Sequence, residues 1–237
     1  MAITYRMLDP RSHTARGRDK SIAFKPGTPV MVTADDGRSK DGPRPVAYLL
    51  RNTAGGGPNA YLPGAREILL YGDDQCREVL ATVTTEHGTG FGFGGPRFVY
   101  RVLDPDGTLI GRISLRRGRI FRIGRSHWTM DQAGTPPVRG SAGRLMWWAL
   151  WWTVLLPLNI ALVVAAFTGI AQDPVTTPRR IVWRDSAGRA VMSFRGLAGD
   201  YRVMQDHWDP RMVASLVAIH QTYVSIAISD STDWYHR

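Results

Sequence analysis

The stretch that decides the fold is residues 209–229, DPRMVASLVAIHQTYVSIAIS. Asp209 followed by Pro210 is typical of a helix start, because aspartate caps free N–H groups and proline fits the first helical position. Residues 212–229 then carry no formal charge over 18 positions. A helix that is apolar on all sides is buried, either in protein or in lipid. The sequence therefore predicts a buried C-terminal helix over residues 210–228.

Upstream of this helix, short apolar runs alternate with turn signals. Two Asp-x-x-Gly turns, Asp104–Gly107 and Asp185–Gly188, each separate a pair of such runs and indicate β-hairpins. The strands predicted after residue 64 are 67–71, 77–85, 98–103, 108–115, 120–123, 128–130, 180–184, 189–194 and 200–204. The pattern predicts a mainly β protein built as a meander of hairpins.

The first 64 residues have a different composition, rich in Gly, Pro, Arg and Asp. Short strand-like runs occur at 22–24, 30–33 and 46–50, and residues 51–64 read as a linker. We therefore predict a partly disordered N-terminal region over 1–64 and a β-domain over 65–237.

A long apolar stretch interrupts the predicted hairpins. Residues 145–171, LMWWALWWTVLLPLNIALVVAAFTGIA, are 27 positions without a charged side chain. Such a run is a membrane-span candidate, and tryptophan gathers at membrane–water boundaries. The predicted anchor residues are Trp147, Trp148, Trp151, Trp152, Pro157 and Asn159. This stretch predicts a membrane localisation.

Three courses are open to this stretch. A single kinked span would put its two flanks on opposite sides of a bilayer, where they could not share one barrel. A turn at Pro157–Asn159 would give two arms of about 18 Å, long enough to enter one leaflet and return. A helix pair buried in protein is the third course. Arginines flank both ends, which favours a cytoplasmic position for both flanks and for the β-domain.

The charge balance is strongly basic, with 30 Lys+Arg against 20 Asp+Glu and a net charge of +10. Such a charge favours anionic partners, and beside a hydrophobic stretch the simplest partner is an anionic lipid surface. The predicted lipid-facing patch is Arg112, Arg116, Arg117, Arg119, Arg122, Arg125, Arg144, Arg179 and Arg180. The alternative is a set of solvated strand-edge arginines. Nucleic acid is disfavoured, because no recognised module interleaves aromatic and basic residues.

Residues with catalytic or metal-binding potential do not form a known constellation. The histidines lack metal-ligand spacing, and His220 is predicted to be a hydrogen-bonded core residue. Cys76 follows Asp73 and Asp74, which would raise the pKa of its thiol rather than activate it. Residues 90–95 fit G-x-G-x-x-G, but Pro96 and a strand follow, which favours a loop. We therefore predict no catalytic residue, metal or cofactor, and favour a non-enzymatic role.

Four segments together resemble a known family. They are FVYRVLDPDGTLIGRI (98–113), HWTMDQAG (127–134), IVWRDSAGRAVMSF (181–194) and DYRVMQDHWDPRMVASLVAIHQTYVSIA (200–227). This order of parts resembles the tubby C-terminal-like superfamily, in particular its LURP-one-related and phospholipid-scramblase-like branch. The resemblance implies an antiparallel β-barrel closed around the C-terminal helix, and contact with phospholipids. The apolar insertion at 145–171 departs from the family's core pattern.

These features together predict a membrane-associated, non-enzymatic β-barrel that contacts anionic phospholipids, with scramblase-like activity as the finer expectation from the resemblance. The alternative is a subunit of a larger complex, in which 145–171 is a buried protein–protein element.

Overall fold

The computed structural model describes residues 2–8, 29–38, 42–51, 65–89, 97–116, 126–142, 180–195 and 199–223. The strands are β1 (Ile3–Leu8), β2 (Val30–Asp35), β3 (Arg44–Arg51), β4 (Glu67–Tyr71), β5 (Val79–Thr89), β6 (Arg97–Leu103), β7 (Leu109–Arg116), β8 (His127–Gln132), β9 (Val138–Ala142), β10 (Arg180–Arg184), β11 (Ala190–Arg195) and β12 (Asp200–Val203). The helix α4 (Pro210–Gln221) follows β12.

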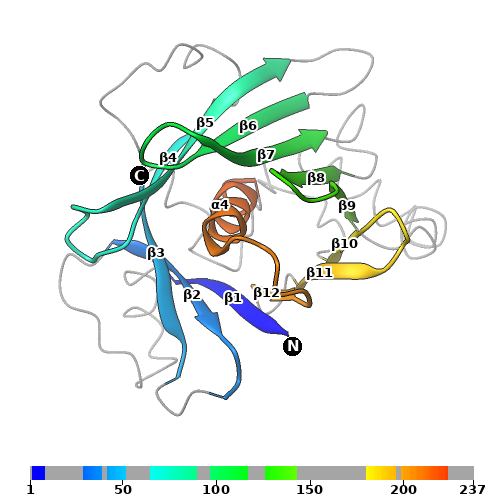
Figure 1. Cartoon of the computed structure of the whole chain (residues 1–237), viewed down its shortest axis with the longest axis horizontal. Coiled ribbons are helices and arrows are strands. Elements are labelled where there is room, and N and C mark those ends of the chain that lie inside the picture. The colour runs from blue at the N-terminus through cyan, green and yellow to red at the C-terminus, as the bar shows by residue number, and fades with distance from the viewer. Residues whose placement is uncertain are drawn as a thin grey trace, which may run out of the picture.

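The strands of the described chain form a closed antiparallel barrel of twelve, in which each strand pairs with its neighbours in sequence. The barrel closes where β1 pairs with β12, with Ile3 opposite Val203 and Arg6 opposite Asp200. Figure 1 views the barrel end-on and shows α4 at its centre. The predicted mainly β fold, with a barrel around the C-terminal helix, is confirmed.

The inner face of the wall is apolar because side chains of a strand alternate between its two faces. In β6, Phe98, Tyr100 and Val102 are buried while the residues between them are partly exposed. In β4, Ile68 and Leu70 are fully buried in the same way. Closure of the wall leaves a lumen that these side chains and α4 fill together.

The helix α4 occupies the lumen because it has no polar face to expose. Residues 212–221 are all buried, and Leu216 and Met212 are among the largest fully buried side chains. At its start, the Asp209 carboxylate accepts a hydrogen bond of 2.8 Å from the Arg211 backbone N–H, and Pro210 takes the first helical position. The predicted helix start is therefore correct. The helix ends at Gln221, and residues 224–228 of the predicted helix lie outside the described residues.

One close approach explains why a glycine interrupts β9. Gly140 pairs with Trp128 on β8 and with Trp183 on β10. A Cβ atom at Gly140 would lie 2.8 Å from two atoms of the Trp183 ring, which is fully buried. The indole thus packs directly over the β9 backbone, where a side chain does not fit.

The strand predictions are mostly confirmed, and two of them, 67–71 and 180–184, coincide with β4 and β10. Strands β1 and β9 were not predicted. The predicted strands at 22–24 and 120–123 lie outside the described residues. The predicted domain boundary at residue 65 is wrong, because β1, β2 and β3 form part of the barrel wall.

Within the described part of the chain, no helix has both the length and the apolar character needed to cross a bilayer. Residues 145–171 lie outside the described residues, as do all six predicted anchor positions, Trp147, Trp148, Trp151, Trp152, Pro157 and Asn159.

Candidate functional site

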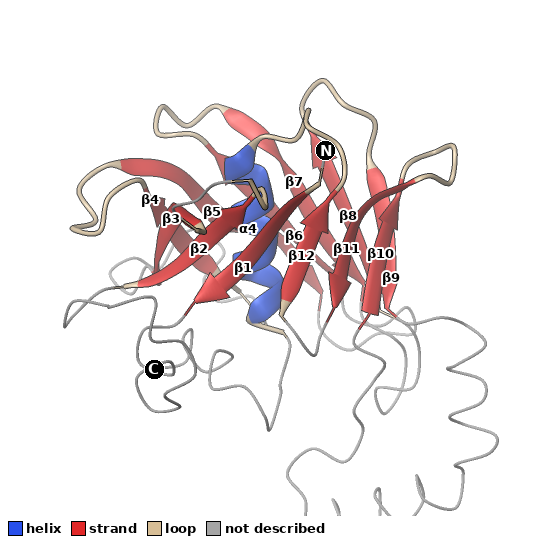
Figure 2. Cartoon of the chain, turned by 90° about the horizontal axis from the view of Figure 1, so that it is seen from below, coloured by secondary structure: helices blue, strands red, loops and turns tan. Residues whose placement is uncertain are grey.

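The two ends of the barrel differ in how the strands are connected. In an antiparallel barrel, successive connections alternate between the two ends. One end holds the β2–β3, β4–β5, β6–β7, β8–β9 and β10–β11 connections and the link from β12 to α4, and we call it the turn rim. The opposite end, where β3, β5, β7, β9 and β11 terminate, is called the basic rim. Figure 2 shows the tan turns gathered at the upper end of the barrel.

The turn rim uses its carboxylates to build tight turns. The Asp73 carboxylate accepts hydrogen bonds from the backbone N–H groups of Arg77 and Glu78, at 2.8 and 2.9 Å. The bond from Glu78, followed by other backbone bonds, holds the pKa of Asp73 below its ordinary value. Asp104 and Asp185 accept backbone N–H groups in the same way, at 2.7 and 2.8 Å. The carboxylates of these aspartates are therefore bound by backbone N–H groups of their own turns, as turn chemistry predicts.

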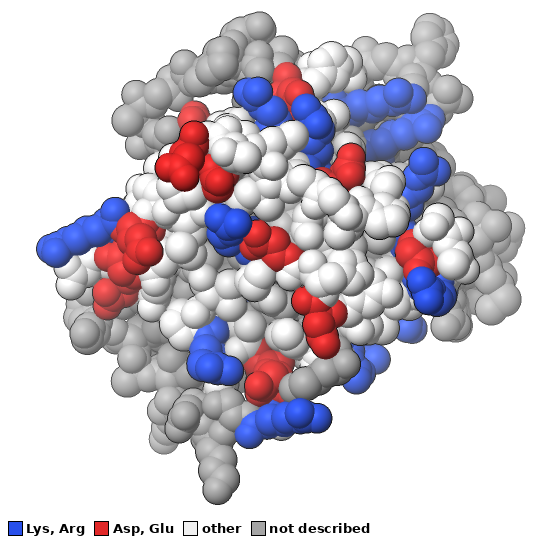
Figure 3. Space-filling model, viewed as in Figure 1, with Lys and Arg blue, Asp and Glu red and all other residues white. Residues whose placement is uncertain are grey.

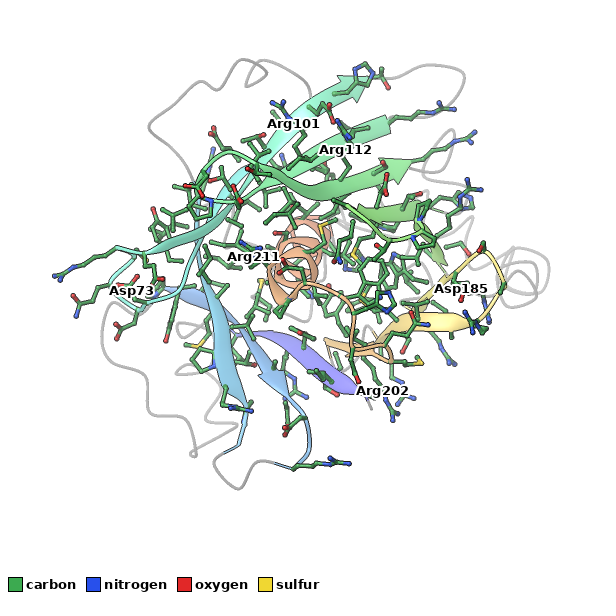
Figure 4. All side chains as sticks on the ribbon, in the orientation of Figure 1. Asp73, Arg101, Arg112, Asp185, Arg202 and Arg211 are labelled. Carbon is green, nitrogen blue, oxygen red and sulfur yellow. The ribbon has the colours of Figure 1, made fainter. Side chains whose placement is uncertain are left out.

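Figure 3 views the turn rim and shows carboxylates distributed over it, with basic side chains among them. Figure 4 places Asp73 and Asp185 in turns on opposite sides of the barrel, with Arg211 near the centre. Among the described residues, no group of three His, Cys, Asp or Glu side chains could hold a metal ion. The turn rim thus has a structural explanation for its charge.

The basic rim gathers arginines from strands that are neighbours in the wall. Arg97 on β6 lies opposite Arg116 on β7, which lies opposite His127 on β8, and all three are exposed. Further round the wall, Arg180 on β10 lies opposite Arg195 on β11, and both are exposed. Cross-strand neighbours lie about 5 Å apart, so the arginines of these rows concentrate positive charge at one end of the barrel, with the His127 imidazole beside them.

Carboxylates near this end are largely engaged by other arginines of the wall. Asp200 forms an ion pair with Arg6 at 2.7 Å. Glu86 accepts two hydrogen bonds from Arg112, at 2.8 and 3.3 Å, and these bonds lower the pKa of its carboxyl group. Because these carboxylates are paired with Arg6 and Arg112, they do not neutralise the exposed arginines of the basic rim.

The centre of the basic rim is closed by the end of α4. The Tyr223 ring packs against Phe98 and edge-on against Trp128, with ring centroids 5.8 and 6.0 Å apart, and its hydroxyl bonds that of Tyr100. The Arg66 guanidinium lies 5.2 Å from the centroid of the Tyr223 ring. This aromatic cluster covers the lumen beneath the arginine rows.

His220 is buried one turn inside this cluster. Its Nδ1 lies 2.6 Å from the Tyr201 hydroxyl, which also accepts a hydrogen bond of 3.0 Å from the Gln221 side chain. Burial lowers the pKa of His220 to about 3, so the ring is neutral. With 4% of its surface exposed, His220 is enclosed by the described residues around it. The prediction that it is a hydrogen-bonded core residue is confirmed.

Cys76 lies in the turn between β4 and β5. Partial burial raises the pKa of its thiol, and the carboxylates of Asp73 and Asp74 raise it further. The prediction that these neighbours disfavour the thiolate is confirmed, and Cys76 offers no activated nucleophile.

The structure distributes the predicted basic patch over two places. Arg116 and Arg180 lie at the basic rim, while Arg112 lies in the middle of β7, on the outer wall beside Arg101, where Glu86 binds it (Figure 4). The other predicted members lie outside the described residues: Arg117, Arg119, Arg122, Arg125, Arg144 and Arg179. Sequence reasoning missed Arg97, His127 and Arg195, although each begins or ends a strand at the rim where Arg116 lies.

A shallow groove of about 360 Å³ lies on the outer wall where β1, β2 and β12 meet. Thr4, Asp35 and Arg202 contribute to its lining, together with Asp200. Both signs of charge face this groove, so neither a simple anion nor a simple cation is favoured.

The fold and the site define the class: a closed twelve-stranded antiparallel barrel with a central helix and one strongly basic rim. Comparison of the chain with protein-family models, curated proteins and solved structures gave no significant match.

Proposed function

We propose that this protein is a non-enzymatic, membrane-associated barrel that contacts anionic phospholipids through its basic rim. One observation carries the proposal. The chain leaves β9 at Ala142 and enters β10 at Arg180, so the apolar stretch 145–171 is attached at the same end of the barrel as the arginine rows. An apolar element and a positive surface on one side suit a bilayer with anionic headgroups.

The architecture supports the tubby-like and phospholipid-scramblase-like part of the proposal. A closed antiparallel barrel with a C-terminal helix through its centre is what the resemblance of residues 98–113, 127–134, 181–194 and 200–227 implies. Scramblase-like lipid transfer is the finer activity that follows from this resemblance. Vesicles that carry a fluorescent phospholipid in both leaflets test this activity. Scrambling moves labelled lipid from the inner to the outer leaflet, where an external quencher can reach it.

The electrostatic contribution can be gauged from general magnitudes. Each basic residue near an anionic membrane surface contributes about 1 kcal/mol. Three rim arginines would therefore contribute about 3 kcal/mol, or about 100-fold in affinity. Because Arg144 and Arg179 also flank the apolar stretch, the proposal places the barrel on the cytoplasmic side.

Flotation of the full chain with lipid vesicles tests the proposal. The test variant replaces Arg97, Arg116 and Arg180 by glutamine. The control variant makes the same change in net charge with Arg38, Arg77 and Arg139, which are exposed at or near the turn rim. We expect the test variant to lose about 100-fold in affinity for vesicles containing phosphatidylserine, and the control to keep it.

Recovery of the full chain away from the vesicles, at low and high salt alike, would overturn the proposal. If the protein does not bind vesicles but shifts RNA in a gel, the result would indicate a nucleic-acid partner instead.

Deletion of residues 145–171 separates the proposal from the alternative of an assembly subunit. Ala142 and Ile181 are paired in register, so a short Gly-Ser loop from residue 144 to residue 172 can replace the stretch without opening the wall. The membrane proposal expects a folded barrel with weakened vesicle binding. A folded barrel that keeps vesicle binding but loses a protein partner supports the assembly role.

A further inference from the structure

The outer wall has a groove at the seam where the barrel closes, and the strand register explains its shape. Thr4 on β1 lies opposite Asp35 on β2 and opposite Arg202 on β12, so the three side chains form one row on the outer face. The side chain of Thr4 is shorter than those on either side of it. The groove of about 360 Å³ therefore runs over β1, with Ala2 and Thr4 in its floor and charged groups of opposite sign along its two sides.

Two of the carboxylates that line the groove are already paired with arginines. Asp36 forms an ion pair with Arg44 at 3.8 Å, and Asp200 forms one with Arg6 at 2.7 Å. The charges of these two carboxylates are therefore balanced by side chains of the wall itself, and they do not require a ligand.

Three charged groups of the groove form no ion pair with the residues that the structure describes. They are the carboxylate of Asp35 and the guanidinium groups of Arg195 and Arg202. One oxygen of Asp35 accepts a hydrogen bond of 2.7 Å from the Gly37 backbone N–H, a turn contact that does not neutralise its charge. Both arginines are exposed, and Figure 4 places Arg202 on the outer side of the wall, away from α4. The groove thus has one anionic side and one cationic side.

Asp35 and Arg202 are too far apart to neutralise each other directly. Strand β1 lies between their strands, which places their Cα atoms about 10 Å apart. A hydrogen bond of about 2.8 Å from each group to a ligand leaves about 4 Å between the ligand's own two charged groups. An ammonium group and an oxyanion joined by two methylene groups have about this separation.

We propose that this groove binds a small zwitterion, with the ligand's ammonium group against the Asp35 carboxylate and its oxyanion between Arg195 and Arg202. Hydrogen bonds between ionised groups are about twice as strong as neutral ones, and a ligand with both charges forms them on both sides of the groove. A simple anion would be repelled by Asp35, and a simple cation by the two arginines. This inference goes beyond the proposed function and does not depend on binding to membranes.

Two sources supply a ligand of this chemistry: a soluble amino acid, and the headgroup of an aminophospholipid. β-Alanine is the soluble probe, because two methylene groups separate its ammonium group from its carboxylate. Propionate and propylamine are its matched controls, since propionate lacks the ammonium group and propylamine lacks the carboxylate. Phosphatidylethanolamine is the lipid probe, because two methylene groups also separate its ammonium group from its phosphate ester.

Titration of the full chain with β-alanine, followed by the backbone amide NMR shifts of Thr4 and Arg202, measures soluble binding. We expect saturable shifts with β-alanine and binding at least about tenfold weaker with propionate and with propylamine, because each lacks the charged hydrogen bonds on one side. Arg202→Gln and Asp35→Asn should each weaken β-alanine binding by a similar factor, and asparagine still accepts the Gly37 N–H. Arg139→Gln is the control, because Arg139 is exposed on β9, outside the groove.

Flotation of the full chain with vesicles measures binding to the lipid headgroup. The ammonium group of phosphatidylethanolamine has N–H donors for Asp35, whereas the quaternary group of phosphatidylcholine has none. At a constant content of anionic lipid, exchange of phosphatidylcholine for phosphatidylethanolamine raises vesicle affinity if the headgroup is the ligand. Asp35→Asn should abolish that increase, and Arg139→Gln should keep it.

The outcomes separate the two sources from each other and from failure. Binding of β-alanine without an effect of phosphatidylethanolamine assigns the groove to a soluble zwitterion, and an effect of phosphatidylethanolamine that Asp35→Asn abolishes assigns it to the headgroup. The inference is overturned if neither probe binds, if propionate binds as tightly as β-alanine, or if Arg202→Gln and Asp35→Asn change nothing. None of these failures touches the proposed function, which is tested separately through Arg97, Arg116 and Arg180.

Discussion

The turn rim and the basic rim are built from the same strands, yet they use charge in opposite ways. At the turn rim, carboxylates such as those of Asp73 and Asp185 accept backbone N–H groups and shape the turns. At the basic rim, the exposed side chains of Arg97, Arg116 and Arg180 make no ion pair within the described chain. Charge that local structure does not require is the charge to examine for a partner.

The largest effect on stability is expected from a substitution in the core that both rims share. Leu216 is fully buried in α4, so Leu216→Ala leaves a cavity in the lumen and should lower the free energy of unfolding by about 2–5 kcal/mol. Chemical denaturation measures this change. If the rims are two surfaces of one unit, loss of near-UV circular dichroism and loss of vesicle binding should coincide along the denaturation curve. Binding that persists after the barrel has unfolded would contradict this coupling.

Acidification should affect the two ends in separate pH windows. His220, near the basic rim, has a folded pKa of about 3 against an ordinary 6.5, so the unfolded state takes up the proton first. Stability is therefore lost as pH falls from about 6.5 towards 3, by at most about 1.4 kcal/mol per pH unit.

At the turn rim the pKa of Asp73 is lowered from 3.8 by backbone hydrogen bonds, so its contribution is present above pH 3.8 and lost below it. Denaturation at several pH values measures both windows. His220→Phe keeps a ring in the aromatic cluster and should remove the slope between pH 6.5 and 4. An unchanged slope in this variant would assign the upper window to another group.

Loss of the helix cap at the turn rim should lower the stability of the protein without changing its binding to vesicles. Asp209→Ala removes the hydrogen bond to the Arg211 backbone N–H and the 2.8 Å ion pair with its side chain. We expect a loss of about 1 kcal/mol in the free energy of unfolding, measured by thermal or chemical denaturation. Vesicle affinity under folded conditions should not change. Asp209→Asn is the control, because asparagine also caps helices.

The smallest expected effect is a difference in vesicle binding between variants of two arginines on β7. Arg116→Gln at the basic rim should weaken binding to anionic vesicles by about 1 kcal/mol, or about fivefold. Arg112→Gln breaks an ion pair on the outer wall and should leave binding unchanged and stability within about 1 kcal/mol. Flotation of the two variants side by side measures the difference. Equal losses would mean that the outer wall, rather than the rim, meets the lipid.

Much of the fold was predictable because its signals are local. The Asp-x-x-Gly turns and the Asp209-Pro210 cap mark hairpins and a helix start by short-range chemistry, and the structure places them as predicted. Strand β9 was missed because VRGSA has weak strand character. Its glycine, Gly140, is explained by a tertiary contact, since a side chain there would clash with the Trp183 ring. Strand β1 was missed because its partner in closure, β12, lies about 200 residues away in the sequence.

The basic rim was only partly predictable. Clustering in the sequence selected Arg112 and Arg116, and a position beside the apolar stretch selected Arg180. Being close in the sequence does not place residues at one end of a barrel. The register of β6, β7 and β8 brings Arg97 and His127 beside Arg116, and it moves Arg112 away from the rim. Register depends on which strands pair, and that information is nonlocal.

The closure of β1 on β12 has a consequence for synthesis of the chain. A ribosome releases β1 long before β12 and α4. The wall cannot become a ring, nor can its lumen fill, until nearly the whole chain has emerged. During that interval the apolar inner faces of the early hairpins have no final partner, which is the state in which nascent chains recruit chaperones or aggregate.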